Sequence, residues 1–212
     1  MGLFKTYTAK TVSKPKNEIA VVNKKFVLPQ SVTLVLREKI FSLSGDDFSI
    51  KDINGVEYLR CKGKALSIRN KKILYDVDQT PLLNIQKALM SLKGNVKIYA
   101  GDSDEKVLAT IGQSGVFAVK KYVVEFFNEA TGKNESFDMK CDYLSYTCAI
   151  FYGHEKEGAP VVAKVTKKLD KKTLFTGMQN YFVEIAPGVD IALMCALAIC
   201  FDEYKNEPKN KK

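Results

Sequence analysis

The sequence has no tryptophan, a single histidine and five cysteines without a regular spacing. Metal sites are usually built from several histidine or cysteine ligands, and a catalytic serine or cysteine needs a histidine as its base. An odd number of cysteines argues against a closed disulfide framework and favours a reducing compartment. No P-loop, dinucleotide fingerprint or nucleophile elbow is present. We therefore expect no catalytic residue, no metal, no cofactor and no enzymatic activity.

The sequence also lacks an apolar N-terminal leader and an apolar segment of membrane-spanning length. Lysines interrupt the region from Met1 to Lys25, which argues against a secretory signal. The C-terminal apolar run Ile191–Phe201 would rise about 16 Å as a helix, whereas the hydrocarbon core of a bilayer is about 30 Å thick. We expect no transmembrane span and a cytoplasmic protein, either peripheral on a membrane or shuttling to the nucleus.

The isolated polar residues have simple interpretations. His154 lies in the charged segment Gly153–Gly158, which is typical of an exposed hairpin tip. Cys195 and Cys200 lie in the apolar run, where cysteine behaves as a small hydrophobic residue.

Basic residues exceed acidic ones, 33 against 24, so that the formal net charge is +9. This charge favours anionic partners such as lipid headgroups, nucleic acid or acidic proteins, although it also serves solubility. Two basic clusters stand out, and lysines at strand ends can contact several phosphates as rotatable point charges. The alternative is a solvated rim of loops. The predicted anionic-lipid-binding residues are Lys62, Lys64, Arg69, Lys71 and Lys72 in the first cluster and Lys164, Lys167, Lys168, Lys171 and Lys172 in the second.

Composition divides the chain into one domain with two tails. Residues 1–25 are predicted to be a basic tail, residues 26–204 a single domain, and residues 205–212 a short polar tail. The first six residues fit the pattern for N-myristoylation at Gly2. One acyl chain anchors only marginally, and the lysines that follow would supply a second membrane signal.

The dominant hydrophobic period inside the domain is two, which predicts β-strands separated by turn sequences. Asn54-Gly55 is a strong hairpin signal, because a type I′ turn needs positive φ at both positions. About twelve strands at short intervals favour a barrel or a sandwich. The predicted strands are Ser31–Lys39, Phe48–Asp52, Val56–Lys62, Lys72–Val77, Leu82–Ala88, Val96–Ala100, Val107–Ile111, Val119–Phe127, Glu135–Cys141, Tyr146–Tyr152, Val161–Lys168 and Tyr181–Ala186.

The run Ile191–Phe201 is apolar at every position and rich in helix formers, which predicts a helix surrounded by protein on all sides. Asp190 precedes it, where a carboxylate suits the unpaired amides of a helix start. Asp202 and Glu203 are expected to close it. The alternative is a buried core strand.

Several segments, taken in order, resemble the LURP-one-related family. They are Gly45–Asp52 with Asn54-Gly55 and Tyr58–Arg60, Ile73–Asp76 with Pro81–Ile85, Lys97–Tyr99, Tyr152-Gly153 with Val161–Val165, and the closing Gly188–Ala192 with Asp202-Glu203. That family is similar in fold to the Tubby C-terminal domain and the phospholipid scramblases. The resemblance therefore implies a mainly β fold, a closed antiparallel barrel of about twelve strands around a buried hydrophobic C-terminal helix.

The resemblance also bears on function. Tubby-like relatives bind phosphoinositides through basic residues, so it implies a non-enzymatic module that docks on anionic phospholipid headgroups as a tether or adaptor. It does not imply a scramblase-style calcium site, because Asn180–Pro187 offers only Glu184. Two alternatives stay open: a nucleic-acid or transcription-linked adaptor, and a domain that binds a protein partner without lipid.

Overall fold

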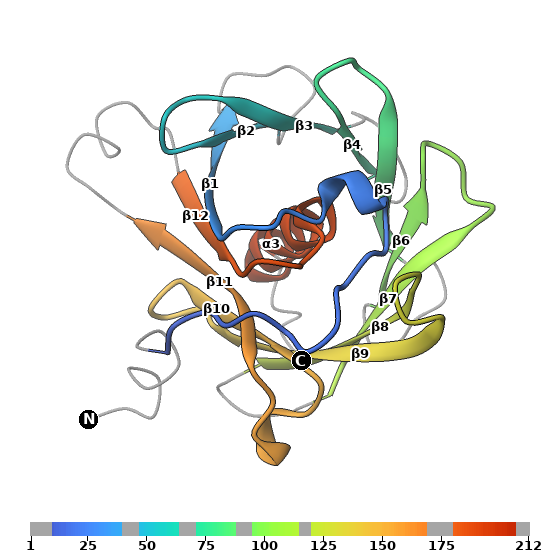
Figure 1. Cartoon of the computed structure of the whole chain (residues 1–212). Coiled ribbons are helices and arrows are strands. Elements are labelled where there is room, and N and C mark those ends of the chain that lie inside the picture. Colours follow the sequence, from blue (N-terminus) through green and yellow to red (C-terminus); the bar gives the residue numbers. More distant parts are fainter. Residues whose placement is uncertain are drawn as a thin grey trace, which may run out of the picture.

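The computed structural model describes residues 10–39, 47–63, 71–87, 95–114, 120–168 and 180–206. Its strands form one closed barrel, in which each strand pairs antiparallel with its neighbours in sequence and β1 pairs with β12 (Figure 1). The prediction of a closed antiparallel barrel is thereby confirmed. The strands are β1 (Val32–Lys39), β2 (Asp47–Asp52), β3 (Glu57–Gly63), β4 (Lys72–Tyr75), β5 (Pro81–Lys87), β6 (Val96–Ala100), β7 (Val107–Gln113), β8 (Lys120–Asn128), β9 (Lys133–Asp142), β10 (Thr147–Tyr152), β11 (Val161–Lys168) and β12 (Asn180–Ile185).

The strands alternate between an inner face in the core and an outer face. In β12, for example, Tyr181, Val183 and Ile185 are buried, whereas Phe182 and Glu184 between them are partly exposed. The predicted period of two therefore corresponds to the two faces of the barrel wall.

Helix α3 (Ile191–Asn206) fills the lumen of the barrel (Figure 1). Every residue from Ile191 to Asp202 is at most 4% exposed, so the predicted buried helix is confirmed. The helix ends later than predicted, because Asp202 and Glu203 continue it. Their carboxylates pair with lysines of the barrel wall, so they need not leave the helix to reach solvent.

Asp190 fixes the start of α3. Its Oδ1 accepts hydrogen bonds from the backbone N–H groups of Ala192 and Leu193, at 3.0 and 3.2 Å. Its Oδ2 accepts from Val21 and Val22 of the N-terminal segment, at 3.1 and 2.7 Å. Burial raises the pKa of this carboxyl, and the backbone donors oppose that shift. One side chain thus caps the helix and ties the N-terminal segment to it.

The N-terminal segment, residues 10–31, crosses the end of the barrel at which α3 begins, which we call the capped end (Figure 1). It contains the short helix η1 (Lys24–Phe26). Ile19, Ala20, Val21 and Phe26 are buried there. The prediction of a tail for residues 1–25 therefore needs correction for residues 10–25, whose apolar side chains cover the helix start. Residues 1–9 and 207–212 lie outside the described residues.

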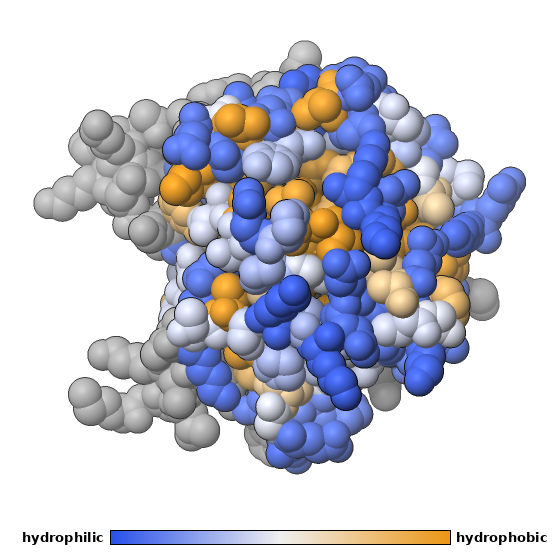
Figure 2. Space-filling model, in the orientation of Figure 1, coloured by the Kyte–Doolittle hydropathy of each residue, from blue (hydrophilic) through white to orange (hydrophobic). Residues whose placement is uncertain are grey.

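Figure 2 views the capped end and shows hydrophobic surface near its centre, surrounded by hydrophilic side chains. We call the opposite end, where α3 ends, the far end. The turns at the capped end are rich in acidic residues. They include Asp76 and Asp78 between β4 and β5, Asp102, Asp104 and Glu105 between β6 and β7, and Glu155 and Glu157 in helix η2 (Glu155–Glu157) between β10 and β11.

Candidate functional site

The first predicted lysine cluster is divided by the barrel wall. Lys72 starts β4 on the inner face, its side chain is 4% exposed, and its Nζ lies 3.0 Å from Glu203 Oε1 of α3. The side chain of Lys71 is 14% exposed and pairs with Asp104 at 3.5 Å. Lys62 is exposed, and its Nζ lies 5.3 Å from the centre of the Tyr75 ring. Lys64 and Arg69 lie outside the described residues.

The second cluster is divided in the same way. Lys167 faces the lumen with a side chain that is 3% exposed. Its Nζ donates to the Tyr181 hydroxyl at 2.8 Å and lies 3.9 Å from Asp202 Oδ1, and the Tyr181 hydroxyl donates to the same carboxylate. The side chain of Lys164 is 13% exposed and pairs with Glu184 at 2.8 Å. Lys168 ends β11, and Lys171 and Lys172 lie outside the described residues.

The expectation that these lysines lie exposed at strand ends is wrong for Lys72 and Lys167. Both occupy inward positions of their strands, in register with Ile85 and Tyr181, because the alternation of β4 and β11 continues to the strand ends. There they meet acidic residues at the C-terminal end of α3, where cations are favoured by the helix dipole. Their evident role is to hold the helix end. Lipid binding by the remaining residues of the clusters is untested and stays a prediction.

The turn between β9 and β10 is a feature of the far end that the sequence analysis missed. Leu144 at its tip is 90% exposed, the largest exposure among the large hydrophobic side chains of the described residues. Tyr143 and Tyr146 flank it, and Tyr143 stacks on Phe201 of α3 with a centroid distance of 5.2 Å. Lys120 Nζ lies 5.7 Å from the centre of the Tyr143 ring. The pattern Tyr-Leu-Ser-Tyr between two strands, with an apolar residue at a turn position, was the available signal.

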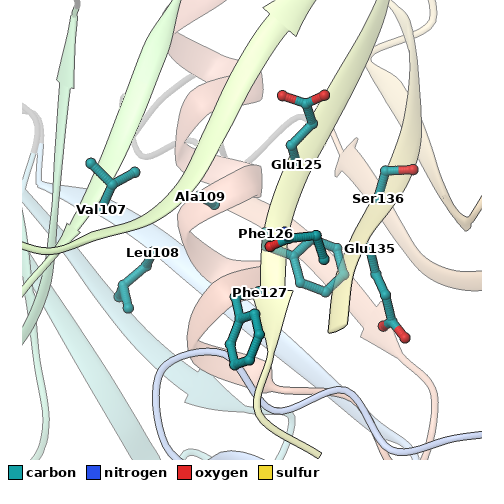
Figure 3. Close-up of a pocket in the computed structure, with 9 residues that line it drawn as sticks. Val107, Leu108, Ala109, Glu125, Phe126, Phe127, Glu135 and Ser136 are labelled. Carbon is teal, nitrogen blue, oxygen red and sulfur yellow. The ribbon is translucent and has the colours of Figure 1, made fainter. Parts of the chain in front are cut away.

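A groove of about 580 Å³ opens on the outer wall, where β7 and β8 diverge towards the capped end. Figure 3 shows Val107 and Leu108 on one side of it and Phe127 on the other, with Glu125 and Ser136 at its upper end. Phe127 is 51% and Val107 44% exposed. Sequence periodicity gives no sign of this groove, because it depends on where two paired strands separate.

The single histidine and the five cysteines form no recognisable functional site in the described residues. His154 is exposed on the connection between β10 and β11, as predicted, with Nδ1 3.4 Å from Asp138 Oδ1. Cys141 Sγ and Cys148 Sγ lie 3.2 Å apart in the wall, and burial raises the pKa of the Cys148 thiol. All five cysteines are buried and unlinked, including Cys195 and Cys200 in α3. Within the described residues, no three histidine, cysteine, aspartate or glutamate side chains gather in a way that suits a metal ion.

None of the helices in the described part of the chain has both the length and the apolar character needed to cross a bilayer.

Comparison with known proteins gives a consistent result over the barrel. A family model described as LURP-one-related matches residues 32–202. Protein LURP-one-related 10 of Arabidopsis thaliana is 26% identical over 193 residues, which cover 89% of this chain and 98% of that protein. Protein LURP-one-related 15 and Protein LURP1 of the same plant are 24% and 23% identical and cover 89% and 87% of this chain, and 87% and 89% of their own lengths.

A solved X-ray structure of a protein from Arabidopsis thaliana has the same fold, with a TM-score of 0.62 and 20% identity over 88% of this chain and 99% of its own. The names of the three relatives state no enzymatic activity. The family model spans β1 to the last turns of α3, including Asp190 and Asp202, the two acidic residues buried at the ends of the helix. The chain therefore belongs to the LURP-one-related family.

Proposed function

We propose that this protein is a non-enzymatic binding module that docks on anionic phospholipid membranes through the far end of its barrel, as a tether or adaptor. The observation that carries the proposal is the turn at Leu144, an exposed leucine between two tyrosines with Lys120 beside them. Leucine inserts among acyl chains, tyrosine suits the membrane–water interface, and lysine meets headgroup phosphates. The three residue types stand at one end of the molecule.

The direction of the strands also favours the far end as the membrane-binding end. The segments that carry Lys64 with Arg69, and Lys171 with Lys172, follow β3 and β11, and both of these strands run towards the far end. Lys62 near the end of β3 is exposed, but its Nζ donates to Gln79 Oε1 at 3.3 Å in the turn between β4 and β5, so it is not counted among the far-end residues. Lys64, Arg69, Lys171 and Lys172 themselves lie outside the described residues, and they remain predicted lipid-binding residues.

The charges of the capped end argue against docking by that end. Its turns carry Asp78, Asp102, Glu105 and Glu129, which an anionic leaflet repels. Lysines of the N-terminal segment stand among these acids, and Lys25 is paired with Asp76 at 3.2 Å. The far end is therefore the better candidate for an anionic surface.

The test is co-sedimentation with phosphatidylcholine vesicles with and without phosphatidylserine or a phosphoinositide. We expect the simultaneous change of Lys64, Arg69, Lys171 and Lys172 to glutamine to weaken binding to the anionic vesicles by roughly three orders of magnitude if all four lie near the surface, at about 1 kcal/mol for each charge. Leu144→Asp should weaken it about tenfold or more, because a leucine side chain gains about 1.5–3 kcal/mol on burial. High salt should reduce the first effect, since the Debye length falls to about 3 Å at 1 M.

The control changes three exposed lysines of the N-terminal segment at the capped end, Lys14, Lys16 and Lys24, to glutamine. It removes three positive charges, against four in the far-end variant, and should leave vesicle binding nearly unchanged. If folded far-end variants bind as the wild type does while the control loses binding, the orientation is wrong. If none of the variants changes vesicle binding, or the wild type binds duplex DNA and no vesicle, the proposal fails and an alternative adaptor role replaces it.

A further inference from the structure

The groove between β7 and β8 has an apolar part that nothing in the described residues covers. In Figure 3, Val107 and Leu108 lie on β7 at one side of the groove and Phe127 lies on β8 at the other. Leu108 is only 8% exposed, whereas half of the Phe127 side chain is open to solvent. The volume of about 580 Å³ is enough for one or two large side chains of another molecule.

Glu125 at the upper end of the groove differs from the other carboxylates near it. It is exposed and has no hydrogen bond or ion pair with any residue that the structure describes. The neighbouring acids are engaged. Glu135 accepts hydrogen bonds from Asn128, Thr131 and Tyr152, the backbone N–H of Glu155 donates to Asp138, and Glu129 pairs with Lys106. The groove therefore offers, beside an apolar hollow, a carboxylate at Glu125 that has no partner in the described residues, and a second carboxylate at Glu135 that is hydrogen-bonded only to neutral groups.

The spacing of these two features matches an extended peptide. Glu125 and Phe127 are two residues apart on the outer face of β8, which separates them by about 6.8 Å along the strand. Side chains at positions i and i+2 of an extended segment have the same separation and point the same way. Thr110 and Ser136 are in register with Glu125, and Asn134 is in register with Phe127, so polar groups are at hand for such a segment.

We propose that this groove binds an extended segment of a partner protein that carries a large apolar residue and, two positions away, an arginine. The apolar side chain fills the hollow formed by Val107, Leu108 and Phe127. The guanidinium pairs with Glu125, where its planar fork can donate two parallel hydrogen bonds, which a lysine cannot do.

Charge complementarity favours an arginine-containing segment over an anionic ligand in this groove. Although the protein as a whole carries +9, the carboxylate of Glu125 makes the groove locally negative, which disfavours lipid headgroups and nucleic acid there and favours a cation. The groove also lies on the side wall, in the half of the barrel near the capped end. It thus remains open when the far end contacts a membrane, although the proposal does not depend on that contact.

The probe is the peptide acetyl-Ala-Leu-Ala-Arg-Ala-amide, titrated into the full-length isotope-labelled protein and followed by heteronuclear NMR. We expect shifts confined to β7, β8 and β9 around Val107, Glu125 and Phe127. Citrulline in place of arginine should weaken binding about tenfold or more, because a neutral group replaces one half of a charge-assisted pair. A peptide with arginine directly after leucine should also bind more weakly, because the two side chains then point to opposite faces.

Glu125→Gln should weaken binding of the arginine peptide by a similar factor and leave the citrulline peptide unchanged. The variant keeps the fold, because the side chain is exposed and makes no described contact. Glu157→Gln, at another exposed carboxylate, is the matched control and should change nothing. Equal binding of the arginine and citrulline peptides, shifts centred elsewhere, or no binding at millimolar peptide would each overturn the proposal.

Discussion

The two ends of helix α3 are held by opposite chemistry. At the capped end one buried carboxylate, Asp190, accepts hydrogen bonds from backbone N–H groups of the helix and of the N-terminal segment. At the far end two buried lysines, Lys72 and Lys167, meet Glu203 and Asp202 at the end of the helix. The positive end of the helix dipole thus faces an anion, and the negative end faces cations.

The contrast between the two ends explains how an apolar helix takes one position in a barrel. The run from Ile191 to Phe201 is buried on all sides, and apolar contacts of this kind are not directional. They favour burial but set neither the depth of the helix nor its orientation. The polar contacts at the two ends are directional, and together they determine both.

A substitution in the middle of the helix should cause the largest loss of stability, against which substitutions at the two ends can be compared. Leu197→Asp would bury a charge without a partner among apolar side chains, and we expect it to lower the free energy of unfolding by about 5 kcal/mol or more, enough to prevent folding. Circular dichroism and urea titration of the purified protein measure this. A variant that unfolds cooperatively with near-normal stability would show that α3 does not fill the lumen.

The capped end should show the next largest effect. Asp190→Ala leaves buried N–H groups of Val21, Ala192 and Leu193 without their acceptor, and we expect a loss of about 3–5 kcal/mol in urea unfolding. Because the same carboxylate holds the N-terminal segment, hydrogen exchange at Val21 and Val22 should rise as well. Asp190→Asn keeps one carbonyl acceptor and should lie between the wild type and the alanine variant. If alanine and asparagine destabilise equally, the capping interpretation is incorrect.

Substitutions at the far end should lower the free energy of unfolding less than Asp190→Ala does. Lys167→Met removes the cation beside Asp202, and we expect a loss of about 2–3 kcal/mol, less than for a fully broken buried pair because the Tyr181 hydroxyl still donates to Asp202. Lys72→Met should cost less again, because the Glu203 side chain is 19% exposed and can reach water. Thermal unfolding of both variants against wild type measures the order. A larger loss for Lys72→Met would reverse our ranking of the two pairs.

The fold could be predicted from the sequence with few errors, and the candidate sites only in part. The period of two, the hairpin at Asn54-Gly55 and the fully apolar run at Ile191–Phe201 are local signals, and each led to the observed element. The hairpin turn is not of type I′, however, because Gly55 has a positive φ and Asn54 does not. The exposed tip at Leu144 and the unpaired Glu125 were not predicted. Each depends on what neighbouring strands and turns leave uncovered.

The alternating strands, the buried helix and the position of Asp190 at the start of that helix all follow from local sequence. Which lysines stabilise the fold depends on the closed barrel. A lysine at a strand end has the same local sequence whether it faces solvent or the lumen, and its side chain is long enough to suit either. Lys72 and Lys167 became buried because closure of the barrel brought the acidic end of α3 within their reach, and that proximity depends on the whole chain.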